Sequence, residues 1–371
     1  MSAAREVIER IAFSLLRGLP AEAPGLLGDD GLHRLLHMPA EEVTRATGGA
    51  RGMARDLARR GEALQRAAAE YEYATAHGIR CLSPADPDWP DGLRDIADAP
   101  RMLYILGKGS LTAKRMLSVV GTRRATAYGT TMTRRLIEAL SERCAPVSIV
   151  SGLAYGIDCA AHTAALETGM PTLAIVAHGL GMIYPSAHRD LAHRIVEAGG
   201  AIVSEYPHDT RPWRGQFLER NRIVAAISAV TLVAETPVKG GALSTASCAD
   251  SYGRAVLAVP GRVGDEASAG CNHLIRSRRA EICTSAGDII ETAGWSDAGV
   301  RQAAPEQMSL FEPMGDEKLV ADCLRGSAEP VQFDIIAQRT GIAVPALLAL
   351  LAEMEFDGHL LRYPGNRFAL G

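Results

Sequence analysis

Between residues 117 and 291 the hydrophobic pattern alternates between short apolar runs and longer amphipathic stretches. The apolar runs are nearly continuous, which is typical of strands buried on both faces of a parallel sheet, and the stretches between them have helical periodicity. The predicted strands span 117–120, 147–151, 172–176, 201–204, 230–234 and 255–259; the predicted helices span 127–143, 155–168, 187–198, 217–227 and 243–253. This order predicts an α/β fold with a Rossmann-like, doubly wound and mostly parallel sheet.

The regions before and after this alternating pattern differ from it. Residues 1–76 have the pattern of short helices joined by glycine-containing turns, which predicts a small helical domain of the SAM or helix-hairpin-helix kind. Residues 77–295 form the extended Rossmann-like domain, and its proline-rich segment 78–109 contains a short predicted strand at 102–106. Residues 296–315 have no clear periodicity and are interpreted as a linker.

The last segment, residues 316–371, has the pattern of a winged helix. It contains a helix, a helix-turn-helix around 340–344 and a closing hairpin that turns at 364–366. The helix at 345–354, in the place of a recognition helix, is apolar and acidic (PALLALLAEM). Helices that read DNA present Arg, Lys, Asn or Gln to the bases. We therefore expect this domain to contact protein or to pack, and not to read a DNA groove.

The composition limits the classes of function. The formal net charge of −4 over 371 residues gives no global attraction to nucleic acid, so such binding requires a local basic patch. No apolar run is long enough to cross a bilayer and the N-terminus lacks the pattern of a signal peptide, so we expect a cytoplasmic protein without a membrane span. The seven cysteines are scattered without a CxxC pair and are interpreted as small buried hydrophobes.

Glycines, hydroxyls and basic residues follow the predicted strands, at the edge where parallel sheets bind their ligands. Gly121, Thr122 and Arg123 precede a helix whose N-terminus favours anions, whereas Arg124 is interpreted as peripheral. Later loops and the segment FLERNR add the candidates Gly152, Tyr155, Arg220, Arg222, Lys239, Gly240, Gly241, Ser244 and Thr245. Together these residues predict a positive rim that holds phosphate groups, with Tyr155 or Phe217 available to stack on a base.

The sequence offers little support for catalysis or for a bound cofactor. Ser151, Asp158 and His162 supply a serine, an acid and a base, but no GxSxG nucleophile elbow is present. The segment KGGALSTAS is not a Walker A sequence and no GxGxxG follows the first strand, so no cofactor is predicted. The histidines are scattered without HExxH or any ligand spacing, so no metal is predicted.

Several motifs taken together resemble one family. VGTRRATAYG, VSGLAYGIDCAAH, IYPSAH, SEYP, ERNRIVAAIS, KGGALSTA and GRAVLAVPG occur in this order over residues 78–285, and they closely resemble the DNA-processing protein A (DprA/Smf) family. The resemblance implies a non-enzymatic Rossmann-like domain that binds single-stranded DNA and forms a homodimer. It also implies that the protein loads the RecA recombinase onto incoming DNA during natural transformation.

The resemblance also implies where DNA binds. Transferred to this chain, the family's pocket includes residues 121–123, Ser151 with Gly152, and residues 239–245. Two departures from the family pattern affect this transfer. Ser186 follows Tyr184-Pro185 where some members have a DNA-binding lysine, so Arg189 or Arg214 would have to compensate; and GGALSTA replaces the common SGSLITA.

The competing hypothesis is an enzyme of the LOG-like nucleoside monophosphate phosphoribohydrolases, which share this type of sheet. Those enzymes use a PGGxGTxxE loop, and the glutamate of this loop acts on the ribosyl group of the substrate. KGGALSTAS lacks the leading proline, the second-turn glycine and the closing glutamate. The missing carboxylate makes this chemistry the less favoured alternative.

Overall fold

The structure of the protein, a computed structural model, describes residues 3–49, 53–144, 146–295, 315–325, 331–356, 359–363 and 366–370. The chain divides into two compact units, residues 1–300 and residues 301–371. The predicted linker 296–315 lies outside the described residues except for Gly315, and so does most of the predicted turn at 364–366.

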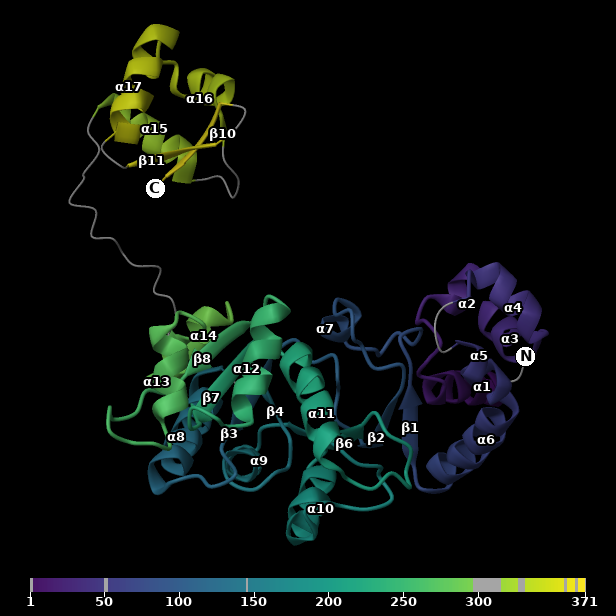
Figure 1. Ribbon diagram of the computed structural model, residues 1–371. Helices are drawn as coiled ribbons and strands as arrows, with labels where there is room; N and C mark the ends of the chain where they lie inside the picture. The colour runs from purple at the N-terminus through teal and green to yellow at the C-terminus, as the bar shows by residue number, and fades with distance from the viewer. Residues whose placement is uncertain are drawn as a thin grey trace. The chain divides into compact units, whose positions relative to one another are not determined.

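The first unit is built on a sheet whose described strands follow the order β1-β2-β6-β5-β4-β3-β7-β8-β9 (Figure 1). Their bounds are β1 Ile79–Leu82, β2 Leu103–Gly107, β3 Met116–Gly121, β4 Ser148–Ser151, β5 Thr172–Val176, β6 Ala201–Ser204, β7 Val230–Glu235, β8 Ala255–Ala258 and β9 Glu281–Ile282. The pairings from β6 through to β9 are parallel, whereas β2 pairs antiparallel with both β1 and β6. The predicted mostly parallel, Rossmann-like sheet is therefore confirmed, and its predicted strands lie within two residues of their expected ends.

Two strands of this sheet, β1 and β9, were not predicted from the sequence. Both lie at the edges of the sheet, and each is short and partly exposed. Nearly continuous apolar runs predict strands that are buried on both sides, and a short edge strand with exposed side chains does not produce such a run.

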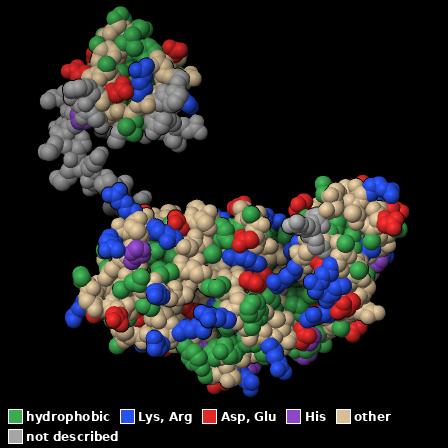
Figure 2. All heavy atoms as spheres, viewed as in Figure 1, with side chains coloured by type: hydrophobic (Ala, Val, Ile, Leu, Met, Phe, Trp, Pro, Cys, Tyr) green, Lys and Arg blue, Asp and Glu red, His purple; other side chains and the backbone are tan. Residues whose placement is uncertain are grey.

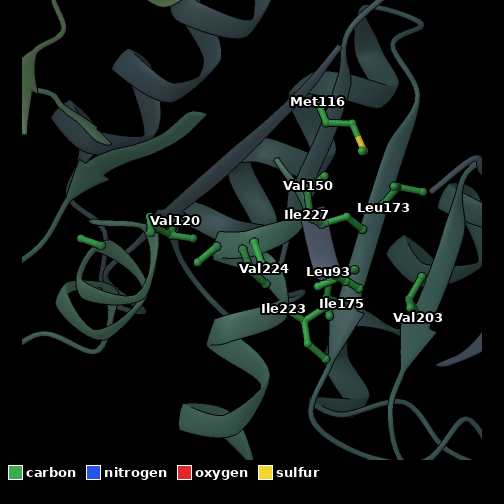
Figure 3. Packing of buried hydrophobic residues seen from close by; sticks show 14 of the residues in the cluster. Leu93, Met116, Val120, Val150, Leu173, Ile175, Val203, Ile223, Val224 and Ile227 are labelled. Carbon is green, nitrogen blue, oxygen red and sulfur yellow. The ribbon is translucent and has the colours of Figure 1, made fainter. Parts of the chain in front are cut away.

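Side chains of the central strands alternate between the two faces of the sheet, and each face is covered by its own helices. One face carries α7 (Asp91–Arg94), α11 (Arg214–Ile227), α12 (Ala242–Ser251) and α13 (Ala269–Arg276). The other carries α8 (Ala127–Cys144), α9 (Ile157–Glu167), α10 (Arg189–Glu197) and α14 (Ala286–Thr292). Figure 3 shows Ile223, Val224 and Ile227 of α11 gathered with Leu93 over Val150 and Ile175 of the sheet. Burial on both faces fixes the sheet, and with it the loops at its edge.

Helices fill the N-terminal region. They are α1 Ala3–Leu15, α2 Ala23–Leu26, α3 Gly31–His37, α4 Ala40–Thr47, α5 Met53–Ala58 and α6 Arg60–Ala76. Their apolar residues, such as Ile11 and Leu35, share one core with Met102 and Tyr104 at β2. This region is therefore packed onto the antiparallel edge of the sheet, and it belongs to the same compact unit.

The second unit has the predicted helix, helix-turn-helix and closing hairpin of a winged helix, together with one short strand, β10 (Val331–Gln332), that was not predicted. These are α15 Asp316–Arg325, β10 Val331–Gln332, α16 Phe333–Thr340, α17 Val344–Phe356, β11 Leu360–Tyr363 and β12 Arg367–Leu370, with the strands in the order β10-β12-β11. Ile336, Leu347 and Phe368 are part of its own core.

Tested for membrane-spanning length and hydropathy, no single described helix qualifies. Helix α16 and residues 344–355 of α17 qualify only as a pair, bent by 113°.

Candidate nucleic-acid interface

An open cavity of about 820 Å³ lies at the carboxyl ends of the central strands. The chain runs from β3 outward through β4, β5 and β6, and then returns to β7 on the other side of β3. The loops after β3 and β7 therefore diverge at this point, where doubly wound sheets bind ligands. The cavity is lined by ten of the thirteen candidate residues: Gly121, Thr122, Arg123, Gly152, Arg220, Lys239, Gly240, Gly241, Ser244 and Thr245.

The loop after β3 is held by backbone contacts that leave one arginine exposed. The Thr122 N–H donates to the Glu235 carbonyl at 2.7 Å, and the Thr122 carbonyl accepts from the Ile157 N–H at 3.2 Å. A side chain at Gly121 would place a Cβ 2.3 Å from Ile157 Cγ1, so only glycine fits there. Arg123 follows in an exposed position, and its guanidinium carbon lies 4.7 Å from the centre of the Phe217 ring.

The loop after β7 forms the opposite wall. Gly240 is packed against its own loop, since a Cβ there would lie 2.0 Å from Thr236 Oγ1, whereas Gly241 has no other atom within 4 Å of a Cβ position. Lys239 is exposed, and Ser244 lies in the first turn of α12. The N–H groups at the start of a helix carry partial positive charge, so this wall attracts anions.

The exposed cations of the cavity have no carboxylate partner among the described residues. Within the described part of the chain, none of the ion pairs includes Arg123, Arg214 or Lys239, and all three residues line the cavity. Figure 2 shows Lys and Arg side chains beside hydrophobic side chains over the middle of this face of the molecule. A locally basic site therefore exists on a chain of net charge −4.

Arg220 lies at the base of the cavity and is buried, being only 5% exposed. Its Nη1 donates to the Gly152 carbonyl at 2.8 Å and also to the Ile175 carbonyl. Burial lowers the pKa of Arg220, and burial raises the pKa of nearby Asp158, while the opposite charges of the two groups counteract both shifts. A Cβ at Gly152 would lie 2.2 Å from Nη1. The close approach that Gly152 permits is thus to the protein's own arginine, which links the loop after β4 to strand β5.

Three candidate residues lie outside this cavity. Ser151 is fully buried and its hydroxyl donates to the Val119 carbonyl at 2.6 Å. Arg222 pairs with Glu205 at 2.6 Å, so its charge is already compensated. Tyr155 packs edge-on against His188 and lines a neighbouring hollow of about 590 Å³, together with Tyr184, Ser186 and Arg211. Ser186 supplies no basic group where some family members have a lysine. Of Arg189 and Arg214, the two arginines that would have to compensate, Arg214 lines the cavity.

Exposed aromatic side chains on the cavity wall were not singled out from the sequence. Trp213 is 61% exposed and Tyr184 is 46% exposed, and both line the cavity beside Phe217. The segment RPWRGQF interleaves aromatic and basic residues, which is the composition of surfaces that bind single-stranded nucleic acid. That composition was the available signal for Trp213.

The serine, acid and base noted in the sequence do not form a catalytic triad. His162 Nδ1 lies 2.7 Å from Thr172 Oγ1, and burial lowers the pKa of His162 to about 3. Ser151 is bonded to a backbone carbonyl, as described above. Among the described residues that line the cavity, Asp158 alone is acidic, and it faces the guanidinium of Arg220.

Comparison with known proteins identifies the family. The model of the family described as DNA recombination-mediator protein A matches residues 80–294, and that of the DprA winged helix domain matches residues 304–366. Protein Smf of Escherichia coli is 35% identical over 292 residues, covering 77% of this chain and 76% of the relative.

Two solved structures are also similar. DNA processing protein A from Streptococcus pneumoniae is 30% identical with a TM-score of 0.65, covering 78% of this chain and 98% of that one. A structure of DNA processing protein A from Helicobacter pylori, which concerns its single-stranded DNA binding mode, is 30% identical with a TM-score of 0.52, covering 58% of this chain and 94% of that one. With a family model that spans more than half of its length, the chain belongs to the DprA/Smf family of DNA recombination mediators.

Proposed function

We propose that the cavity binds single-stranded DNA through its phosphate groups. The observation that carries this proposal is a set of three cations at the switch point of the sheet, Arg123, Arg214 and Lys239, which form no ion pair with the described residues. Phosphates would lie between Arg123 and Lys239, with the backbone N–H groups of Gly241 and Ala242 at the start of α12 as further donors. The DNA-binding mode of the Helicobacter pylori relative supports this assignment.

The bases would stack on the aromatic side of the same cavity. Phe217, Tyr184 and Trp213 present ring faces or edges there, and Arg123 already lies over Phe217. Stacking on aromatic rings does not depend on which base is present. We therefore expect DNA binding with little sequence preference. We propose that Arg220 and Gly152 form the floor of the cavity and do not contact DNA.

Membership of this family supports a wider role. We infer that the protein loads RecA onto incoming single-stranded DNA in natural transformation, that it works in the cytoplasm beside that recombinase, and that it dimerises through the Rossmann-like domain. In this role no catalytic group is needed, because the protein acts by binding DNA and protein partners.

Substitution of one cavity cation tests the binding proposal. Arg123→Ala is expected to weaken binding of a fluorescent oligonucleotide by about 1–3 kcal/mol, because a charge-assisted contact is lost. The slope of log K against log salt should also decrease by about 0.7 for each phosphate contact removed. Both quantities are measured by fluorescence anisotropy over a range of salt concentrations.

Arg124→Ala is the matched control, since Arg124 is the exposed neighbour of Arg123 and does not line the cavity. It should leave the affinity and the salt slope unchanged. Equal affinities of the wild type and Arg123→Ala would contradict the assignment of the cavity. RecA loading is tested separately, by asking whether the protein accelerates RecA ATPase on DNA that is coated with single-strand-binding protein.

The LOG-like hydrolase is the alternative, and the family comparisons do not favour it. The acidic group that lines the cavity, Asp158, is buried beside Arg220 and does not occupy the loop that carries the glutamate in such enzymes. Release of adenine from AMP by the purified protein would support the alternative. No release, together with salt-dependent DNA binding, supports the mediator.

A further inference from the structure

A cluster of metal-ligating side chains lies in the N-terminal helices and shares no residue with the lining of the cavity. Glu9 of α1 and the pair His33 and His37 of α3 each place one ligand atom within 4.8 Å of the other two. Glu9 Oε1 lies 2.8 Å from His33 Nδ1 and 3.2 Å from His37 Nε2. The three side chains therefore converge on one point between two helices.

The cluster is held in place by the sequence and by the helix packing. His33 and His37 are four residues apart, which places them on the same face of α3, and their ring centres are 4.3 Å apart. Ile11 and Leu35 belong to the core that fixes α1 and α3 in one bundle. The prediction that the histidines lack a ligand spacing missed this pair, whose four-residue separation places both rings on one helix face, and its carboxylate partner Glu9 comes from a different helix.

We propose that Glu9, His33 and His37 bind a divalent transition-metal ion such as Zn²⁺. Ligand atoms of a tetrahedral zinc ion with bonds of about 2.0–2.1 Å are about 3.3 Å apart, close to the separations from Glu9 Oε1 observed here. Two imidazoles and a carboxylate favour Zn²⁺, Co²⁺ or Ni²⁺ over Mg²⁺ and Ca²⁺, which prefer oxygen ligands. The His37 side chain is 41% exposed, so water can supply the fourth ligand.

Arg5 is the group that competes with the ion. Its Nε donates to Glu9 Oε1 at 3.2 Å, and its Nη2 lies 3.0 Å from His33 Nδ1. The Arg5 side chain is 48% exposed, so it can turn into solvent when the ion binds. Each imidazole then binds the ion through the nitrogen that faces Glu9 and carries its proton on the other ring nitrogen. Because the guanidinium repels a cation, Arg5→Gln should bind the ion more tightly than the wild type does.

A comparable group elsewhere is less suited to this role. Glu70, His208 and Asp209 also lie within ligand distance, but this group contains a single imidazole. Its Asp209 pairs with Arg66 at 3.1 Å, and its His208 stacks on Tyr73. These contacts join α6 to the loop after β6, so the side chains of Asp209 and His208 already have partners within the protein.

Cobalt titration of the untagged full-length protein, stripped with chelator and kept reduced, tests the proposal. We expect one Co²⁺ per chain to give a visible absorption band and to raise the melting temperature. His33→Gln and His37→Gln keep an N–H donor for Glu9 but lose the imidazole, and each should weaken Co²⁺ binding by at least about tenfold. His193→Gln, on the exposed surface of α10, is the control and should bind as the wild type does.

The absorption spectrum distinguishes Co²⁺ bound at this site from Co²⁺ bound to cysteine thiols. Burial raises the pKa of Cys81, Cys271 and Cys283 to about 12, which makes these thiols poor ligands, and cobalt bound to thiolate would show a charge-transfer band. If a glutamine variant fails to fold, the test uses the wild type. Bound Co²⁺ should then protect His33 and His37 from modification by diethylpyrocarbonate. Loss of binding in the glutamine variants, or that protection, supports the site. Unchanged binding in the variants, no binding by the wild type, or no protection overturns it.

Discussion

The arginines near the cavity differ in what their guanidinium groups already contact. Arg220 donates to one backbone carbonyl in the loop after β4 and to one in strand β5, and Arg222 pairs with Glu205. Arg123 is exposed, with an aromatic ring beneath it and no carboxylate partner among the described residues. In the proposed complex a phosphate would find no competing carboxylate of the described residues at Arg123, whereas at Arg222 it would have to compete with Glu205. This difference ranks Arg123 above Arg222 as a DNA contact.

His162 is expected to make the stability of the protein depend on pH. It is fully buried, and burial lowers its pKa from the ordinary 6.5 to about 3. As the pH falls below 6.5, His162 becomes protonated in the unfolded chain, whereas in the folded chain it stays neutral until near pH 3. The free energy of unfolding therefore decreases with falling pH across that window. Between pH 7 and pH 5 this group alone should account for a loss of about 2 kcal/mol.

Urea denaturation at pH 7 and pH 5 measures this effect. In His162→Gln the loss of stability between the two pH values should be about 2 kcal/mol smaller than in the wild type. His193→Gln removes an exposed histidine and should keep the wild-type pH dependence. An identical pH dependence in all three proteins would show that His162 titrates normally in the folded state.

At the level of secondary-structure elements, the site depends on how the loops after β3 and β4 are packed. Gly156 has φ +77°, and a Cβ there would lie 2.2 Å from the Thr122 carbonyl oxygen. This close packing lets the first N–H of α9 donate to the same carbonyl, so the position of Arg123 is set by the neighbouring loop. The candidate phosphate contact is thus supported by two elements that are far apart in the sequence.

Gly156→Ala should disturb this arrangement. We expect a loss of at least about 1–3 kcal/mol of stability from the backbone conformation alone, and weaker DNA binding because residues 122–123 must move. Gly169→Ala is the matched control, since its φ of +68° is also positive but no atom lies within 4 Å of the added Cβ. It should cost about 1 kcal/mol and leave DNA affinity unchanged. Chemical denaturation and anisotropy distinguish the two variants, and equal effects would contradict the proposed packing role.

Within the first unit as a whole, the two edges of the sheet differ in how they are covered. The N-terminal helices pack on β1 and β2, whereas β9 at the other edge has Ile282 52% exposed. The nearby loop after β8 presents Val263, which is 100% exposed. An uncovered strand edge with exposed apolar side chains favours pairing with another chain. This edge is our candidate for the dimer contact.

In the proposed homodimer, Val263→Asp should therefore shift the equilibrium from dimer to monomer, because it would place a charge in the proposed apolar contact. Light scattering coupled to size-exclusion chromatography gives the mass. Leu26→Asp, which changes a leucine that is 56% exposed on α2, is the control and should leave the protein dimeric. A monomeric wild type, or a dimeric Val263→Asp variant, would rule out this edge.

Much of the fold followed from local patterns in the sequence. Each strand from β3 to β8 is a continuous apolar run, because both of its sides are buried, and the loops after these strands carry the glycines and hydroxyls that mark a ligand edge. Trp213 was missed because exposure of an aromatic ring is not visible in a hydrophobic pattern. The edge strands β1 and β9 were missed because they are short and partly exposed.

The sequence by itself determined the alternation of elements, the mostly parallel sheet, the winged-helix tail and the family. Only the tertiary structure decided which polar groups are free, because a side chain's partners come from residues distant along the chain. Glu205 and the carbonyls of residues 152 and 175 engage two of the candidate arginines, and Glu9 meets a pair of histidines more than twenty residues away. Charge and residue type are local properties of a sequence, whereas whether a group is satisfied depends on the packing around it.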